Sequence, residues 1–209
     1  TVCGALNGFC IAKLNVPPFI ATMAMMNVAR GLAYVFTDAK PVFGLPESFG
    51  FIGLRELGII PVSVILMVFI IFLSYIILTK TCYGRYIYAV GSNKEVAKLT
   101  GINVDQVRFS VYVISGILSA LAGLVLASKL QNGQATAAVG YELNAIAAVA
   151  MGGTSMSGGR GGIPQTVIGL IVIGIINNAL SLLGVSAYWQ TVAMGVIILI
   201  AVVIDQARK

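Results

Sequence analysis

The chain has 209 residues, of which 58% are hydrophobic and only 10% are charged. Soluble domains carry about 25% charged residues, so the composition excludes an ordinary soluble protein and indicates an integral membrane protein. The formal net charge of +6 does not indicate nucleic-acid binding, because the 13 Lys and Arg residues are scattered and fall mainly at the ends of apolar runs. The three cysteines have no CxxC spacing and no histidine accompanies them, so neither a disulfide framework nor a metal site is indicated.

The apolar runs recur along the whole sequence. Each is close to the roughly 20 residues that an α-helix needs to cross about 30 Å of hydrocarbon. The runs are unbroken, whereas a membrane-spanning barrel would show short segments of alternating polarity. We therefore predict an all-α, polytopic helical membrane protein that forms one transmembrane domain over residues 1–209.

The first two runs are separated by a short polar turn. Residues 1–12 read as the end of a membrane segment, and because the sequence begins with Thr1 in apolar surroundings we expect N-terminal helices to be missing from it. Lys13 and Asn15 predict a cytoplasmic turn, and Pro17-Pro18 suits the first turn of the next helix. That run, 16–37, carries Arg30, whose guanidinium must bond to helix-end carbonyls, reach the membrane surface or line a translocation path.

The next two runs, 58–79 and 109–130, are joined by the polar interval 80–108. Residues 38–57 suit an external loop with a short surface helix, 58–79 return to the cytoplasm, and 109–130 cross outward again. The last of these runs has small residues at helical spacing, which would allow close helix contact. They are Ser115, Gly116, Ser119, Ala120 and Gly123.

The polar interval itself, 80–108, predicts a folded docking element rather than a slack loop. Asn93 suits a helix N-cap, Glu95 falls in the first turn, and Gly101 supplies a left-handed stop. Val96 and Leu99 share one face of the resulting short helix. Its basic residues place the interval on the cytoplasmic side.

A second unusual stretch lies at 141–162. Residues 131–140 are small and polar and suit an external loop, while 141–151 are apolar but too short to span. They run into a glycine-rich turn, 152–162, so we predict a short or broken helix followed by a tight turn that neighbouring protein or water covers. A phosphate-binding loop is not indicated, because the Gly-Lys-Ser/Thr ending and the preceding strand are absent. We expect Gly152, Gly153, Gly158 and Gly159 to pack backbone against a neighbouring helix, with Arg160 on the cytoplasmic side.

The last two runs, 164–184 and 189–204, are joined by a short external turn. The first contains Asn177-Asn178, two amides that point about 100° apart on a helix, so at least one faces protein or water. Helix-to-helix hydrogen bonding and contact with a solute both remain open for them. Tyr188 and Trp189 suit interface anchors.

The basic residues follow the orientation rule for membrane proteins, which also helped to choose this topology. Only Lys40, Arg55 and Lys129 fall outside. The inside set is Lys13, Lys80, Arg85, Lys94, Lys98, Arg108, Arg160, Arg208 and Lys209.

Catalysis is not indicated. The chain has no histidine, and its seven acidic residues all fall in loops or at the ends of runs, so no proton relay is visible within the membrane. No nucleophile with a neighbouring base and no metal-ligand cluster can be assembled. We therefore predict a non-enzymatic chain that binds no cofactor itself and receives its energy from outside.

Several segments resemble the permease subunit of bacterial ribose-type monosaccharide ABC importers, in the branched-chain amino acid and ribose permease superfamily. The most specific is 141–149, Tyr-Glu-Leu-Asn-Ala-Ile-Ala-Ala-Val, which leads into the glycines at 152–155 and 158–161. The remaining segments are 17–22, 29–33, 83–85, 89–93, 97, 100–102, 177–178 and 185–190. Met25, Met26 and 163–165 depart from the family's usual residues.

The resemblance implies a multi-pass protein of the bacterial cytoplasmic (inner) membrane that works as a permease dimer. It implies a cytoplasmic ATPase subunit, which would hold the ATP and Mg, and a periplasmic or extracellular sugar-binding protein. The family's coupling helix would be 93–102, within the loop 80–108. The residues expected to couple to the ATPase are Gly84, Arg85, Asn93, Glu95, Ala97, Leu99, Gly101 and Ile102.

A neutral sugar needs amide, hydroxyl and aromatic partners more than charges. The residues expected along its path are Thr22, Asn27, Arg30, Tyr141, Asn177 and Asn178. Two alternatives remain: a permease for branched-chain amino acids or another small metabolite, and a channel or membrane scaffold that does not couple to ATPases.

Overall fold

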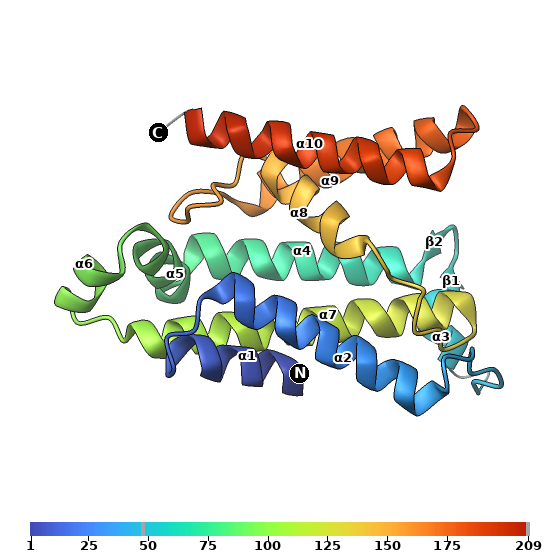
Figure 1. Ribbon diagram of the computed structural model, residues 1–209, viewed down its shortest axis with the longest axis horizontal. Helices are drawn as coiled ribbons and strands as arrows, with labels where there is room; N and C mark the ends of the chain where they lie inside the picture. Colours follow the sequence, from blue (N-terminus) through green and yellow to red (C-terminus); the bar gives the residue numbers. More distant parts are fainter. Residues whose placement is uncertain (47–48, 208–209) are drawn as a thin grey trace. The chain divides into compact units, whose positions relative to one another are not determined.

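The structure, a computed structural model, describes residues 1–46 and 49–207 (Figure 1). Ten helices and one short β-hairpin lie within these residues, which confirms the predicted all-α class. Arg208 and Lys209, predicted to end the chain on the cytoplasmic side, and the acidic Glu47 lie outside the described residues. The chain divides into two compact units, residues 1–72 with 100–138 and residues 73–99 with 139–209.

The first unit is built on α1 (Val2–Ala12), α2 (Pro18–Thr37) and α7 (Val104–Leu130). Helix α1 lies along α7 (Figure 1), and two glycines permit the close approach. A Cβ atom on Gly4 would fall 2.9 Å from the Cα of Gly116, and one on Gly8 would fall 3.0 Å from the Phe109 side chain. Gly116 therefore makes the predicted close helix contact, whereas Gly123 has no atom within 4 Å.

Proline and a left-handed residue set the ends of α2. Pro17 precedes the helix with φ −54° and ψ 128°, and Pro18 occupies the first position, where its missing N–H would have no helical partner. The helix ends at Asp38, which adopts φ 49°. The predicted run 16–37 is thus confirmed as a helix.

The segment after α2 packs on the far end of α7 through one buried serine. It contains α3 (Gly50–Gly53) and the antiparallel strands β1 (Glu56–Leu57) and β2 (Ile60–Pro61). The Ser128 side chain is completely buried; its hydroxyl accepts from the Gly53 N–H at 2.8 Å and donates to the Phe49 carbonyl at 2.5 Å. The predicted surface helix is therefore α3, while the hairpin was not predicted.

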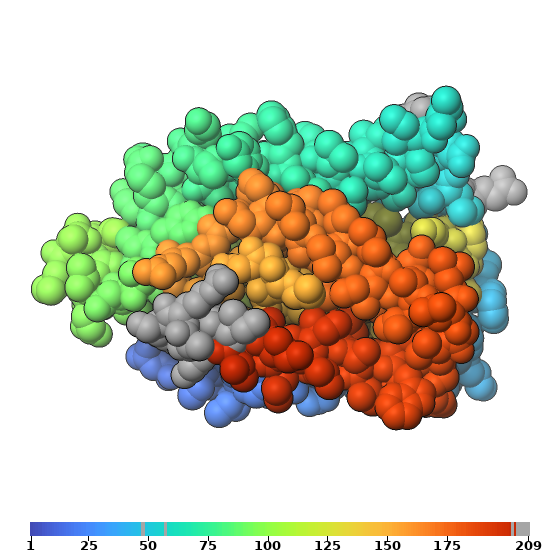
Figure 2. Space-filling model, turned by 90° about the horizontal axis from the view of Figure 1, so that it is seen from above, coloured from blue at the N-terminus to red at the C-terminus, as the bar shows by residue number. Residues whose placement is uncertain are grey.

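The second unit contains α5 (Cys82–Ser92), α6 (Lys94–Leu99), α8 (Tyr141–Met151), α9 (Ile163–Leu182) and α10 (Ala187–Ala207). Figure 2 shows α8 between α9 and α10. The buried core of this unit is small: Ala147 and Ala148 of α8 pack with Ile173 of α9 and Met194 of α10. The short helix predicted before the glycine-rich turn is α8, with the predicted bounds.

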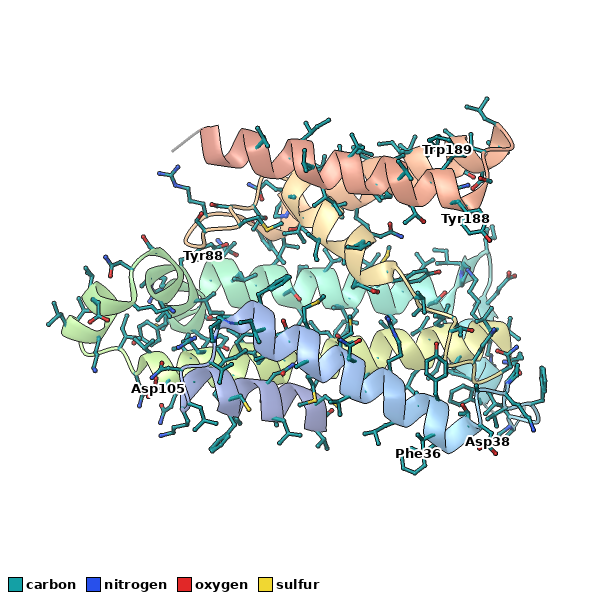
Figure 3. The ribbon with its side chains drawn as sticks, viewed as in Figure 1. Phe36, Asp38, Tyr88, Asp105, Tyr188 and Trp189 are labelled. Carbon is teal, nitrogen blue, oxygen red and sulfur yellow. The ribbon has the colours of Figure 1, made fainter. Side chains whose placement is uncertain are left out.

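Helix α4 (Val62–Lys80) runs through both units and is the most apolar, with a mean hydropathy of 2.8. Among the described residues, four helices, α2, α4, α7 and α9, are long and apolar enough to cross a membrane. Their outward faces are covered with large apolar side chains, which water would not stabilise. Tyr188 and Trp189, labelled at the start of α10 in Figure 3, are 86% and 67% exposed, as expected of residues at a membrane surface. The molecule is a multi-pass membrane protein.

Candidate functional site

Helix α6 has the caps that the sequence predicts. The Asn93 side-chain oxygen accepts from the backbone N–H groups of Glu95 at 2.9 Å and Val96 at 3.2 Å. Glu95 lies in the first turn, where its negative charge favours the positive end of the helix. Gly101 adopts φ +83°, the predicted left-handed stop. The helix spans Lys94–Leu99, shorter than the 93–102 implied by the family resemblance, because Thr100 and Gly101 form the turn that ends it.

Helix α6 exposes two apolar side chains beside its charged ones. Leu99 is 87% exposed and Val96 55%, whereas Ala97 is buried at 2% exposure. Leucine and valine gain from burial rather than from contact with water. Two such residues on a capped helix are typical of a docking surface.

Helix α5 was not predicted, since the sequence pattern placed a helix only in the second half of 80–108. The Thr81 hydroxyl accepts from the Gly84 N–H at 3.2 Å and so caps the helix. A Cβ on Gly84 would lie 2.6 Å from the Ile77 carbonyl oxygen, so glycine permits the tight corner after α4. The Arg85 guanidinium contacts the Cys82 sulfur at 2.8 Å and the Thr81 carbonyl at 3.5 Å. In this structure Gly84 and Arg85 have a local structural role, while their coupling role remains a prediction.

The glycine-rich turn packs on the C-terminal end of α5, within the same unit. The Tyr88 hydroxyl donates to the Gly161 carbonyl at 2.9 Å (Figure 3). A Cβ on Gly91 would lie 2.9 Å from the Gly159 nitrogen, and one on Gly159 would lie 2.8 Å from the Ser92 Cα. The predicted backbone packing against a helix is confirmed for Gly158 and Gly159, whose helix is α5, but is wrong for Gly153, where a Cβ would meet no atom within 4 Å.

The turn holds its shape with positive φ angles and internal hydrogen bonds. Gly153, Gly158 and Gly159 adopt φ of +80°, +90° and +74°, a region that side chains disfavour. The Ser155 N–H donates to the Arg160 carbonyl at 3.0 Å, and the Arg160 residue is exposed. In the described part of the chain, no three metal-ligating side chains gather here or elsewhere.

Two glycines seat α8 on α9. A Cβ on Gly152 would lie 3.1 Å from the Cα of Thr166 and would meet the Gln165 carbonyl first. A Cβ on Gly169 would lie 2.8 Å from the Gly152 nitrogen and closer still to the Ala148 carbonyl. Backbone therefore meets backbone at this crossing, as predicted for Gly152.

Three of the predicted path residues lie on α2. The Thr22 hydroxyl donates to the carbonyls of Pro18 and Phe19, and the Asn27 amide donates to the Met23 carbonyl at 3.2 Å. These bonds stay within the helix, so each side chain has a hydrogen-bond partner without a second helix. Arg30 is partly buried. A solute contact for these three residues remains a prediction.

The other three lie in the second unit. Tyr141 is 56% exposed at the start of α8, Asn177 is partly buried, and Asn178 is exposed. Among the described residues, neither Asn177 nor Asn178 makes a side-chain hydrogen bond, which leaves both amides available to another helix of an assembly or to a solute. The predicted path residues are thus divided, three in each unit.

Sequence reasoning missed two side chains that hold turns in place. Gln190 on α10 donates to the Ser181 hydroxyl at 3.3 Å and to the Val185 carbonyl at 2.9 Å, which ties the turn between α9 and α10. Tyr88 was missed as well, and its position between Gly84 and Gly91 on one short helix was the available signal.

Residues 1–202 match the family described as branched-chain amino acid transport system / permease component. The ribose import permease protein of Bacillus subtilis is 48% identical over 97% of this chain and 64% of its own length. The ribose import permease protein of Escherichia coli K12 is 44% identical over 99% of this chain and 65% of its own length.

The L-arabinose transport system permease protein of Escherichia coli K12 is 39% identical over 98% of this chain and 62% of its own length. The chain therefore spans less than two thirds of the relatives it matches. No solved structure matches it significantly.

Proposed function

Because the chain belongs to the family of branched-chain amino acid transport system permease components, we propose that it is the membrane-spanning part of an ATP-driven importer for a ribose-like monosaccharide. The observation that carries the choice of solute is the 48% identity with a ribose import permease over nearly the whole chain. Such a subunit moves its solute without making or breaking covalent bonds. It acts as a transport component rather than as an enzyme.

The importer would contain partners of three kinds. A cytoplasmic ATPase would bind ATP and Mg, a sugar-binding protein outside the cell would deliver the solute, and a second copy of the permease would complete the path. All would meet at the bacterial cytoplasmic membrane. The exposed apolar side chains Val96 and Leu99 of α6 support a cytoplasmic partner, because a docked protein would bury them.

The transport cycle is alternating access. ATP binding would close the ATPase pair and move α6 as a rigid lever, so that the membrane helices open outward to the binding protein and then inward. The four caps and bonds that define α6 and its neighbour α5 support rigidity in this lever. Tyr141, Asn177 and Asn178 supply exposed or unbonded polar groups for a neutral sugar.

A second function follows from the family description itself, which refers to branched-chain amino acids. An amino-acid solute carries a charged ammonium and a charged carboxylate, which need charged or strongly polar partners. Within the described spanning helices, the charged side chain that lies away from the helix ends is Arg30 of α2. This residue keeps the amino-acid importer as the alternative to test.

Competition for uptake in cells separates the two solutes. The permease at its natural full length, its ATPase and its binding protein are expressed in cells that lack their own ribose uptake, and radiolabelled ribose is supplied. We expect unlabelled ribose to compete and leucine to have no effect. Absence of labelled ribose uptake together with uptake of labelled leucine would contradict the proposal. A set of Ala substitutions at Thr22, Asn27, Tyr141, Asn177 and Asn178 that left ribose uptake unchanged would overturn the proposed path.

A further inference from the structure

The connection between α6 and the rest of the second unit contains no slack segment. Only Asn93 separates α5 from α6; its N–H donates to the Ala89 carbonyl at 3.1 Å, and its carbonyl accepts from Ala97 at 3.0 Å. Its side chain caps α6 at the same time. A force applied to α6 is therefore passed to α5 through hydrogen bonds on both sides of one residue.

Helix α5 then meets the glycine-rich turn, residues 152–162, with backbone against backbone. The contact comprises the Gly91–Gly159 approach and the Tyr88 hydrogen bond to Gly161. Long flexible side chains would absorb a displacement by changing rotamer, but close-packed backbone has no such freedom. The contact is thus suited to passing on a movement of α5.

The glycine-rich turn continues directly from α8. The Gly152 N–H donates to the Ala148 carbonyl at 2.9 Å and the Thr154 N–H to the Val149 carbonyl at 3.2 Å, so helical bonding extends into the turn. From there, Gly152 and Gly169 seat α8 on α9. These two helices carry Tyr141, Asn177 and Asn178.

We infer that the glycine-rich turn is the relay by which movement of α6 reaches α8 and α9, and that Tyr88 and Gly91 are positioning residues in this relay. The inference rests on the proposed function, since it requires an ATPase that moves α6. The competing route leads from α5 directly into α4, through the corner at Gly84. The two routes differ in whether the contact of α5 with the turn matters.

Two small substitutions interrupt the relay in different ways. Gly91→Ala adds a Cβ where only 2.9 Å separates it from the Gly159 nitrogen, yet alanine favours the helical conformation of α5. Tyr88→Phe removes only the hydroxyl that holds Gly161. Tyr86→Phe is the matched control, because Tyr86 lies on the same helix and is exposed.

The measurement is sugar uptake per ATP hydrolysed by the full-length permease with its ATPase and binding protein in proteoliposomes. Loss of one hydrogen bond predicts about a two- to tenfold fall in this ratio for Tyr88→Phe and at least as much for Gly91→Ala, with hydrolysis retained. Tyr86→Phe keeps the ratio of the unmodified importer. An unchanged ratio in both variants would overturn the relay, whereas absence of ATP-dependent uptake in the unmodified importer would overturn the proposed function as well.

Discussion

Asn93 ends one helix and begins the next. Its backbone leaves α5 in an extended conformation, with φ −155° and ψ 112°, and its side chain caps α6. Helices of only six residues are marginal in water on their own, so the cap and the contact of Ala97 determine whether α6 forms. A single side chain thus controls the shape of the proposed lever.

Replacing this cap should weaken the lever before it affects the rest of the molecule. We expect Asn93→Ala to cost about 1 kcal/mol of helix stability, because the N–H groups of Glu95 and Val96 lose their acceptor. Affinity of the purified permease for its ATPase, measured by titration in detergent, should fall about fivefold. Asn93→Asp retains an acceptor and should bind normally; equal losses in both variants would contradict the capping role.

Gly169 permits the close crossing of α8 and α9 because it has no side chain. Any side chain there meets the Ala148 carbonyl on α8. We expect Gly169→Val to destabilise the protein by about 1–3 kcal/mol through overpacking, seen as a lower midpoint of thermal unfolding in detergent. Gly174→Ala on the same helix adds a methyl group in open space and should change the midpoint little, so similar losses in both would contradict the close crossing.

At the scale of elements, α3 and the end of α7 depend on one hydroxyl. Ser128→Ala leaves the Gly53 N–H and the Phe49 carbonyl without their partner, at a cost of about 1–3 kcal/mol. Hydrogen exchange over 49–54 should therefore become faster. Ser119→Ala on the same helix, whose hydroxyl bonds only to the Ser115 carbonyl, should leave that exchange unchanged. Protection of 49–54 that survives Ser128→Ala would show that another contact holds α3.

The long helices and α8 were predictable from sequence because local signals marked both of their ends. Gly140, with φ +91°, and Gly152 bracket α8, and proline starts α2. Helix α5 was not predictable in this way, because Gly84 and Gly91 each cost about 1 kcal/mol in a helix interior. Its contact with the distant turn at 158–161 compensates, and no local pattern shows that contact.

The candidate site was likewise predictable only where local residue types determine its structure. The cap and stop of α6 follow from the residue types of Asn93 and Gly101. The sequence did not show that Thr22 and Asn27 already bond within their own helix, because such bonds depend on side-chain rotamers. Nor did it show that Ser128, one small residue among several on α7, holds α3.

At the scale of the whole molecule, the topology makes a prediction for labelling of single cysteines. With the native cysteines replaced, Ile59→Cys should react with a membrane-impermeant thiol reagent in intact cells, because Ile59 is 97% exposed in the hairpin that the predicted topology places outside. Lys98→Cys and Ser157→Cys should react only after permeabilisation, since α6 and the glycine-rich turn are assigned to the cytoplasmic side. Labelling of Lys98→Cys in intact cells would reverse the assigned orientation.

In the proposed function, ATP drives a ribose-like sugar through the full-length permease. The initial rate of radiolabelled ribose uptake into proteoliposomes tests this function; the proteoliposomes contain the full-length permease and its ATPase, with binding protein on the opposite side from the nucleotide. We predict uptake with ATP and none above background with ADP, with a hydrolysis-deficient ATPase, or without the binding protein. Ribose uptake at the same rate with ADP as with ATP would contradict the account and indicate a channel.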